Sequence, residues 1–322
     1  MEGNAVRRSL DLTSWEAAAR KIRELEIHGE KNSISVKEAC EKFRADCLAR
    51  KLSPATIKKY KYILAELEGK FGDSPVRSIS IDDLREMRQC WKFAGSTARK
   101  RVEYLRAFFA FCVSSGWIAV NPAKGLKPPK FSVAPTLPYN ESDWKSILSA
   151  LDEYGDKHPQ TLDETVLQLK ALVLVMRYSG LRISDAVSLK RERIDAKGRL
   201  FLYQAKTGQP VQVPLPPQVI QVLGQCDTET PFYFWNGGKL QTALSKWQAR
   251  LKKVFEIAKL PEGHSHRFRD SFAVDLLTKG VPLHTVSVLL GHTSVKTTEK
   301  HYAPFVQASQ DALELAVKKT WI

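Results

Sequence analysis

The chain has 322 residues, of which 43% are hydrophobic and 26% are charged, a balance typical of globular proteins with one or two buried cores. Its strongest apolar runs, ALVLVM and FFAFCV, are six residues each, far short of a bilayer span, and its first residues lack the apolar segment of a secretory signal. With 50 Lys and Arg against 35 Asp and Glu, the net charge of +15 favours a polyanionic partner, above all nucleic acid.

The five cysteines are scattered, are odd in number and include no C-x-x-C pair: Cys40, Cys47, Cys90, Cys112 and Cys226. This pattern predicts reduced thiols in a cytoplasmic protein rather than a disulfide framework.

A proline-rich stretch divides the chain. Residues 121–138, NPAKGLKPPKFSVAPTLP, contain five prolines and predict an extended linker. Residues 33–120 show helical periodicity and predict a small all-α domain. Residues 139–322 predict a domain that is mainly α with one small β-hairpin and a C-terminal tail, and residues 1–32 form an N-terminal extension.

Three helices are predicted in the first domain. Ser53 and Pro54 form an N-cap and a favoured first-turn proline ahead of an apolar stripe. Residues 78–91 predict a shorter helix after an aspartate-rich start. Ser96 is predicted to cap a third helix, whose apolar stripe consists of Val102, Leu105, Phe108, Phe109 and Cys112.

In the second domain, residues 165–180 predict a largely buried helix that ends at its glycine, and residues 181–194 predict another. Residues 198–215, GRLFLYQAKTGQPVQVPL, alternate apolar and polar side chains and predict a β-hairpin with a Thr-Gly turn. Helical periodicity returns in four stretches: residues 219–226, 240–258, 271–280 and 283–292. The amphipathic tail has candidate apolar contacts at Phe305, Leu313, Leu315, Val317 and Trp321.

The positive charge is concentrated in the helical region. Residues 35–130 contain 20 basic and 10 acidic side chains, which gives +10 of the total +15. Two clusters lie near predicted helix starts: Lys58, Lys59 and Lys61, and Arg99, Lys100 and Arg101. Such clusters are commonly solvated helix faces, but two in one small domain favour contact with a phosphate backbone.

Five of the seven histidines lie within residues 264–301, and four of these fall in the two stretches HSHRFRD and GHTSVKTTEKHY: His264, His266, His292 and His301. A structural zinc site usually has four Cys or His ligands at short paired spacings. Only the first two histidines have such a spacing, and no cysteine lies nearby, so the pattern disfavours a metal site. A core position without chemistry is the better alternative for His264 and His301.

A third interpretation joins the histidines to nearby cations. Arg182 follows a helix-ending glycine, Arg269 follows His266 by three residues, and Lys206 lies on the predicted hairpin turn. Two arginines, a lysine and histidines can hold a phosphodiester, because a guanidinium grips two phosphate oxygens. Tyr302 is then a sensible nucleophile, since its phenoxide forms a covalent aryl phosphate. The spacing alone does not show that these residues meet.

Four motifs extend this argument: YSGLRISDAVSL, AKTGQPVQVPL, HSHRFRDSFAVDLL and LLGHTSVKTTEKHYAP. In these motifs and in their order, the sequence resembles the tyrosine recombinase, or phage integrase, family over about residues 33–304. The resemblance implies a SAM-like helical core-binding domain and a catalytic domain that form a C-shaped clamp on double-stranded DNA. It also implies site-specific recombination through a 3′-phosphotyrosine and a Holliday junction, by a homotetramer, without metal or ATP. An accessory directionality factor would be a further partner where one is needed.

The resemblance also assigns the reacting residues. Arg182 and Arg269 would clamp the scissile phosphate. Lys206 would protonate the leaving 5′ oxygen, and Tyr302 would be the nucleophile.

Three further residues take supporting roles by resemblance. His266 matches the histidine of the H-x-x-R motif, with a proton-transfer or phosphate-binding role. His292 would lie beside the phosphate. Asp185 corresponds to the acidic residue after the first arginine and would orient its neighbours.

Two departures from the family pattern bear on the site. Asp270 stands where many members have a second histidine after the arginine, so this supporting contact is expected to differ. His292 and Tyr302 are ten residues apart, where nine is commoner. His301 occupies the shorter position but cannot form a phosphotyrosine, so Tyr302 remains the predicted nucleophile.

Several alternatives stay open at this point. Residues 1–32 resemble the end of an arm-binding domain, which would make the chain a shortened integrase. The tail either closes its own domain or, as in the family, packs against the next protomer. A type IB topoisomerase would relax supercoils without synapsis, and an inactive DNA-binding protein is disfavoured because every reacting position holds a competent side chain.

Overall fold

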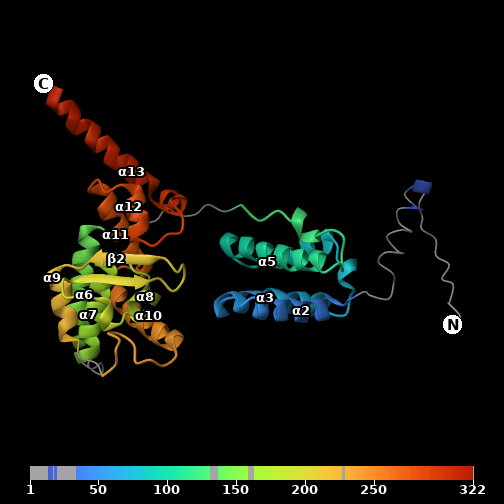
Figure 1. The fold of residues 1–322 in the computed structure, drawn as a ribbon, viewed down its shortest axis with the longest axis horizontal. Helices are drawn as coiled ribbons and strands as arrows, with labels where there is room; N and C mark the ends of the chain where they lie inside the picture. The colour runs from blue at the N-terminus through green and yellow to red at the C-terminus, as the bar shows by residue number, and fades with distance from the viewer. Residues whose placement is uncertain are drawn as a thin grey trace. The chain divides into compact units, whose positions relative to one another are not determined.

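The computed structural model describes residues 14–16, 18–19, 34–130, 137–158, 163–226 and 229–321, with the backbone alone for residues 307–313, 316 and 319. The chain divides into a helical unit, residues 1–133, and a mixed unit, residues 134–322, which are considered separately (Figure 1). The arm-binding remnant predicted for residues 1–32 lies almost entirely outside the described residues.

Between residues 34 and 130, the helical unit contains four α-helices and two 3-10 turns. The helices are α2 (Val36–Ala49), α3 (Pro54–Phe71), α4 (Ile81–Gln89) and α5 (Gly95–Ser114). The 3-10 turns are Val76–Ser78 and Pro122–Gly125. The predicted small all-α architecture is confirmed here.

Two of the three predicted helix starts agree with the structure, and the third differs from it. Ser53 Oγ accepts from the Thr56 backbone N–H, and Ser80 forms a capping box with Asp83. The prediction that Ser96 caps α5 is wrong, because Ala94 is the N-cap and Gly95 is already helical. This helix therefore begins without a side-chain cap.

Aromatic rings pack edge to face in the core of the helical unit. Phe43 on α2 makes a T-shaped contact with Tyr60 at 5.0 Å and with Phe108 at 5.7 Å between ring centroids. Ala123 and Leu126 are fully buried against the same core. The first residues of the predicted linker stretch thus pack onto the helices.

The mixed unit holds the remaining elements. Its helices are α6 (Glu141–Lys157), α7 (Asp163–Ser179), α8 (Ile183–Val187), α9 (Pro217–Gln225), α10 (Leu240–Ile257), α11 (His266–Thr278), α12 (Leu283–Leu289) and α13 (Val295–Lys318). Two 3-10 turns span Arg191–Arg193 and Lys319–Trp321. The sheet consists of β1 (Arg199–Tyr203) and β2 (Pro210–Pro214) (Figure 1).

The predicted hairpin is confirmed. β1 and β2 pair antiparallel with Leu200 opposite Val213 and Leu202 opposite Val211, and these four side chains are buried while their neighbours are exposed. The turn glycine, Gly208, has φ +67°. The alternating pattern of the sequence therefore sets the register of the sheet.

Helix α7 is the centre of the mixed unit. It contacts α6, α8, α9, α10 and α11. It ends at Gly180, whose φ is +64° and where an added Cβ would lie 2.5 Å from the Phe272 ring. Only glycine fits this position, and it directs the following residues toward the predicted site.

The helix predicted over residues 181–194 is much shorter in the structure. Only Ile183–Val187 is α-helical, because the chain then pairs with the segment before α10. The Tyr233 N–H donates to the Leu189 carbonyl at 3.1 Å, and Lys190 forms a bridge with Phe232.

The tail forms α13, which packs on α11 and α12. Phe305 is half-buried against the core of the unit. Of the two alternatives left open for the tail, closure of its own core does not hold for Leu315, Val317 and Trp321, which are 58%, 52% and 72% exposed. Leu313 lies outside the described side chains. Within the described residues, no helix is long and apolar enough to cross a membrane.

Candidate active site

The first arginine lies where α7 gives way to α8. Arg182 is the N-cap residue of α8, is half-buried, and donates from Nη1 to the Gln204 side-chain oxygen. Burial lowers the pKa of its guanidinium, and the nearby Asp185 and Tyr302 oppose that shift. Its charge is thus held beside the predicted nucleophile.

The second arginine is almost completely buried. Arg269 is 1% exposed and donates to the Gly180 carbonyl at 2.7 Å and to the Leu290 carbonyl at 2.6 Å. Burial and the neighbouring Arg182 lower the pKa of its guanidinium to about 10, so that it remains charged at neutral pH. A guanidinium has five N–H donors, which leaves three for another ligand.

Gln204 is a further residue of the candidate site, which the sequence motifs did not indicate. It is 1% exposed, accepts from Arg182, and donates from Nε2 to the Leu290 carbonyl at 2.9 Å. An added Cβ at Gly291, whose φ is +60°, would lie 2.7 Å from this amide. The sequence pattern could have indicated this residue, because position 204 continues the alternation that buries every second side chain of β1 and yet holds a polar residue.

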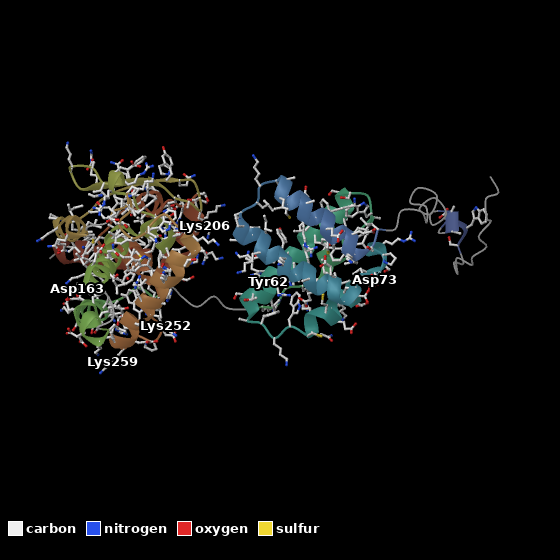
Figure 2. All side chains as sticks on the ribbon, turned by 90° about the horizontal axis from the view of Figure 1, so that it is seen from below. Tyr62, Asp73, Asp163, Lys206, Lys252 and Lys259 are labelled. Carbon is white, nitrogen blue, oxygen red and sulfur yellow. The ribbon has the colours of Figure 1, made fainter. Side chains whose placement is uncertain are left out.

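Asp185 holds the root of the hairpin turn. Its Oδ1 accepts from the Ala205 N–H at 3.0 Å, and its Oδ2 has no hydrogen-bond partner in the described part of the chain. Burial raises the pKa of this carboxyl, against the effect of Ala205 and the two arginines. Lys206 follows Ala205 in the chain and is exposed at the surface of the mixed unit (Figure 2). Its side chain is therefore free to move toward a ligand.

The first turns of α13 explain why the nucleophile lies ten residues after His292. His292 Nδ1 lies 2.8 Å from Thr298 Oγ1, and Thr298 is fully buried. Tyr302 follows four residues later on the same helix face and is 2% exposed, whereas His301 is exposed. The buried face of the helix thus selects Tyr302.

The Tyr302 hydroxyl has a defined partner. It donates to Asp270 Oδ1 at 2.7 Å, and Asp270 is itself 6% exposed. His266 opens the same helix, α11, with its side chain 57% exposed and its Nε2 3.9 Å from the same carboxylate oxygen. Asp270 therefore occupies the position of the missing second histidine and contacts the predicted nucleophile.

The electrostatics of the site fit this arrangement. Burial and the neighbouring Arg269 and Arg182 lower the pKa of His292 to about 4, so that it is neutral at pH 7. Burial and Asp270 raise the pKa of Tyr302, while the two arginines oppose this shift. The hydroxyl is thus protonated in the free protein.

The structure brings most of the predicted residues together. One buried centre contains Arg182, Asp185, Arg269, His292 and Tyr302. Lys206 and His266 are exposed. The core position considered for His264 and His301 is wrong, because both side chains are exposed. In the described residues, no group of three or more His, Cys, Asp or Glu is placed to hold a metal ion.

The two basic clusters of the helical unit differ in character. Lys58, Lys59 and Lys61 are exposed on α3. Lys100 forms an ion pair with Glu103 at 2.6 Å. Arg101 is 16% exposed and ion-paired with Glu66, a contact that gives it a structural role.

The guanidinium of Arg101 is also stacked. It lies 4.6 Å from the ring centroid of Phe93 and 5.3 Å from that of Trp91. Arg99 on the same helix is exposed. Of the two clusters, the one on α3 therefore presents the more accessible charge.

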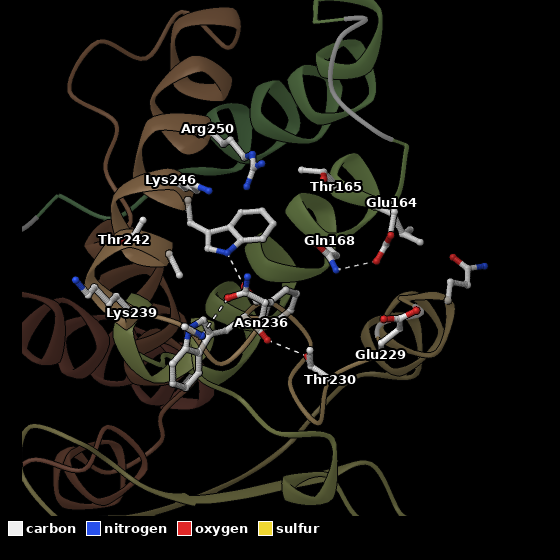
Figure 3. Close-up of a pocket in the computed structure, with 17 residues that line it drawn as sticks. Glu164, Thr165, Gln168, Glu229, Thr230, Asn236, Lys239, Thr242, Lys246 and Arg250 are labelled. Carbon is white, nitrogen blue, oxygen red and sulfur yellow. Dashed lines mark hydrogen bonds between the residues drawn. The ribbon is translucent and has the colours of Figure 1, made fainter.

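A hollow of about 1080 Å³ lies elsewhere in the mixed unit (Figure 3). Figure 3 shows Glu164 and Gln168 of α7 facing Lys246 and Arg250 of α10 across it. Among the described residues, its lining contains no histidine, tyrosine, cysteine or serine. None of the residues of the buried centre lines this hollow, and we place the candidate chemistry at Tyr302.

Comparison with known proteins identifies the family. The sequence model of the phage integrase family matches residues 140–307, which include every residue of the buried centre. The chain belongs to this family. It is 29% identical over 225 residues to a tyrosine recombinase of Thermosipho africanus, covering 68% of this chain and 75% of the relative. It is 31% identical over 235 residues to tyrosine recombinase XerD of Mycobacterium leprae, covering 68% and 72%.

Solved structures of the family share the fold. A lambda integrase fragment in a dimer bound to a COC′ core site matches with a TM-score of 0.65 and 16% identity, covering 82% of this chain and 97% of that chain. An integrase of the Tn1549 transposon in complex with circular intermediate DNA matches with a TM-score of 0.63 and 17% identity, covering 84% and 95%. The predicted fold class is thereby confirmed.

Proposed function

We propose that the protein is a site-specific tyrosine recombinase, which cuts and rejoins duplex DNA through a phosphotyrosine at Tyr302. The observation that carries the proposal is the buried centre that contains Arg182, Arg269 and Tyr302, with the Tyr302 hydroxyl hydrogen-bonded to Asp270. Family membership and relatives named as tyrosine recombinases support the same function. We place the helical core-binding domain at residues 33–120 and the catalytic domain at residues 139–322, acting in the cytoplasm.

Cleavage would begin with attack of the Tyr302 oxygen on the scissile phosphorus. The bond to the 5′ oxygen breaks as the new bond forms, which leaves a 3′-phosphotyrosine and a free 5′ hydroxyl. Negative charge develops on the other phosphate oxygens, and the fixed guanidiniums of Arg182 and Arg269 would stabilise it. Lys206 would give the leaving 5′ oxygen its proton.

Rejoining would reverse this chemistry on a new strand. A 5′ hydroxyl from a partner duplex attacks the phosphotyrosine, and repetition on the other strands passes through a Holliday junction. A lambda integrase tetramer bound to a Holliday junction shares the fold of this chain, with a TM-score of 0.65. We propose the same stoichiometry here. Because the bond energy is kept in the aryl phosphate, neither ATP nor a metal ion would be required.

The exposed lysines of α3 are proposed to contact the phosphate backbone. Substitution of Lys58, Lys59 and Lys61 by alanine should weaken DNA binding and reduce the slope of log K against log salt by about one for every lysine that touches a phosphate. Binding across a salt series measures this slope.

A matched triple variant separates this effect from total charge. Arg50, Lys70 and Arg85 lie in the same unit, and each forms a surface ion pair. Their replacement by alanine removes the same charge and should change the slope less. Equal slopes for the two triple variants would show that only net charge matters.

Lys206 is proposed as the acid for the leaving oxygen. Its replacement by alanine should slow cleavage by roughly 100-fold or more. A substrate whose 5′ oxygen is replaced by sulfur needs no such acid, because a thiolate leaves unprotonated, and should restore the rate. A defect of equal size on both substrates would contradict this role.

The function is tested by trapping the covalent complex. Duplexes that bind the Tyr302→Phe protein are first selected from a randomised pool, and the wild-type protein is then mixed with a nicked duplex of that sequence in EDTA without ATP. A covalent adduct and exchange between two such duplexes are expected. Supercoil relaxation on unrelated plasmids without exchange would favour a type IB topoisomerase, and binding without any adduct would favour an inactive DNA-binding protein.

A further inference from the structure

The contact between Asp270 and Tyr302 is not explained by phosphate binding. The two side chains come from α11 and α13, are 6% and 2% exposed, and lie 2.7 Å apart between Oδ1 and Oη. A buried phenol needs an acceptor, which serine or asparagine can also supply. A buried carboxylate is costly unless a further effect compensates for its desolvation.

The other bases near the hydroxyl are less well placed. Among the described residues, the Tyr302 hydroxyl forms no hydrogen bond with His266, and His266 Nε2 lies 3.9 Å from the carboxylate oxygen to which that hydroxyl donates. His292 Nδ1 is engaged with Thr298 at 2.8 Å. Asp270 is thus the described group to which the Tyr302 proton already points.

We propose that Asp270 is the general base that takes the Tyr302 proton during cleavage and returns it during rejoining. The proposal rests on the proposed recombinase function. As the Oη–phosphorus bond forms, the O–H bond breaks and its proton moves to the Asp270 carboxylate, which becomes a neutral acid. The phosphorus–5′ oxygen bond breaks, and that oxygen receives a proton from Lys206.

Rejoining balances the same protons in reverse. Lys206, which cleavage has left as a neutral amine, takes the proton of the attacking 5′ hydroxyl and becomes an ammonium again. The phosphorus–Oη bond breaks, and the tyrosine oxygen recovers its proton from the Asp270 carboxyl. Both residues end each cycle as they began it.

The electrostatics require that proton loss accompany attack. In the free protein, burial and the adjacent carboxylate raise the pKa of Tyr302 and so disfavour its phenolate. A preformed phenolate is therefore scarce, and the acidity of the hydroxyl rises only as its oxygen bonds to phosphorus. A base already at 2.7 Å can take the proton at that moment without rearrangement.

The test compares Asp270→Asn with wild type on the selected nicked duplex. Asparagine keeps the shape and an accepting oxygen but cannot take the proton. Adduct formation should slow by roughly 100-fold or more, while DNA binding is retained. Asp275→Asn, on the same helix with the half-buried Arg177 as its ion-pair partner, should cleave at the wild-type rate. If Asp270→Asn does not fold, Asp270→Ser is measured in its place.

Two further readouts separate a base from an anchor. Incorporation of a fluorinated, more acidic tyrosine at position 302 should reduce the ratio of the cleavage rates of wild type and Asp270→Asn. The substrate whose 5′ oxygen is replaced by sulfur should leave this ratio unchanged. A rate ratio that fluorination does not change, or cleavage by Asp270→Asn at or above the wild-type rate, would overturn the proposal. Absence of any adduct with the wild-type protein would instead refute the recombinase function itself.

Discussion

Replacement of Tyr302 by phenylalanine is expected to abolish the covalent protein–DNA adduct and all strand exchange, while DNA binding persists. The substitution removes the attacking oxygen and changes little else in shape. It also deprives the buried Asp270 carboxylate of its donor at 2.7 Å, which should lower the free energy of unfolding by about 1–3 kcal/mol. Denaturing gels of the nicked-duplex reaction measure the adduct, and thermal melting measures stability.

Tyr178→Phe is the matched control for this experiment. Tyr178 lies on α7 in the same unit, and its hydroxyl accepts from Gln218 at 3.1 Å outside the buried centre. This variant should form the adduct at the wild-type rate. An adduct that persists in Tyr302→Phe and disappears in Tyr178→Phe would reassign the nucleophile.

Replacement of Arg269 by alanine is expected to damage both stability and chemistry. The guanidinium joins the carbonyl oxygens of Gly180 and Leu290, which end α7 and α12. Its loss leaves the buried Gly180 carbonyl without this donor, at about 1–3 kcal/mol, and opens a cavity, whereas the Leu290 carbonyl keeps the Gln204 amide as a donor. Loss of its charge at the phosphate should reduce cleavage by a further factor of roughly 100 or more.

Two variants separate the two effects of Arg269. Lysine at this position keeps a charge but cannot reproduce the planar fork, so cleavage should stay impaired even where stability partly recovers. Arg267, on the same helix, donates to the carbonyls of Leu137 and Pro138 and stacks on Tyr139 at 4.4 Å. Arg267→Ala should therefore lose stability and keep its cleavage rate per folded molecule. Equal cleavage by Arg269→Ala and Arg267→Ala would contradict a phosphate role for Arg269.

Local patterns predicted much of the fold, because caps and periodicity act over a few residues. The Ser53 cap, the α4 start and the hairpin register all follow from neighbouring side chains. Helix α6 was missed although Asn140 and Asp143 form a capping box that is legible in the sequence. The helix predicted after Arg182 was too long for another reason. Its end is set by pairing with a segment about 40 residues away in the sequence.

The site was predictable in its residue types but not in its contacts. The motifs indicated Arg182, Arg269 and Tyr302, yet the partners of these side chains are distant in sequence. Arg182 contacts Gln204, and Tyr302 contacts Asp270, 32 residues earlier on another helix. Such pairs depend on how helices and the hairpin pack, and no local periodicity encodes them.

The identity of the covalent bond tests the account most directly. Digestion of the trapped adduct with trypsin should release a peptide spanning residues 301–318, which contains a single tyrosine, Tyr302. Mass spectrometry is expected to find the nucleotide phosphate on that tyrosine. A phosphate on His301, or on a tyrosine of any other peptide, would contradict the assignment of the reacting group.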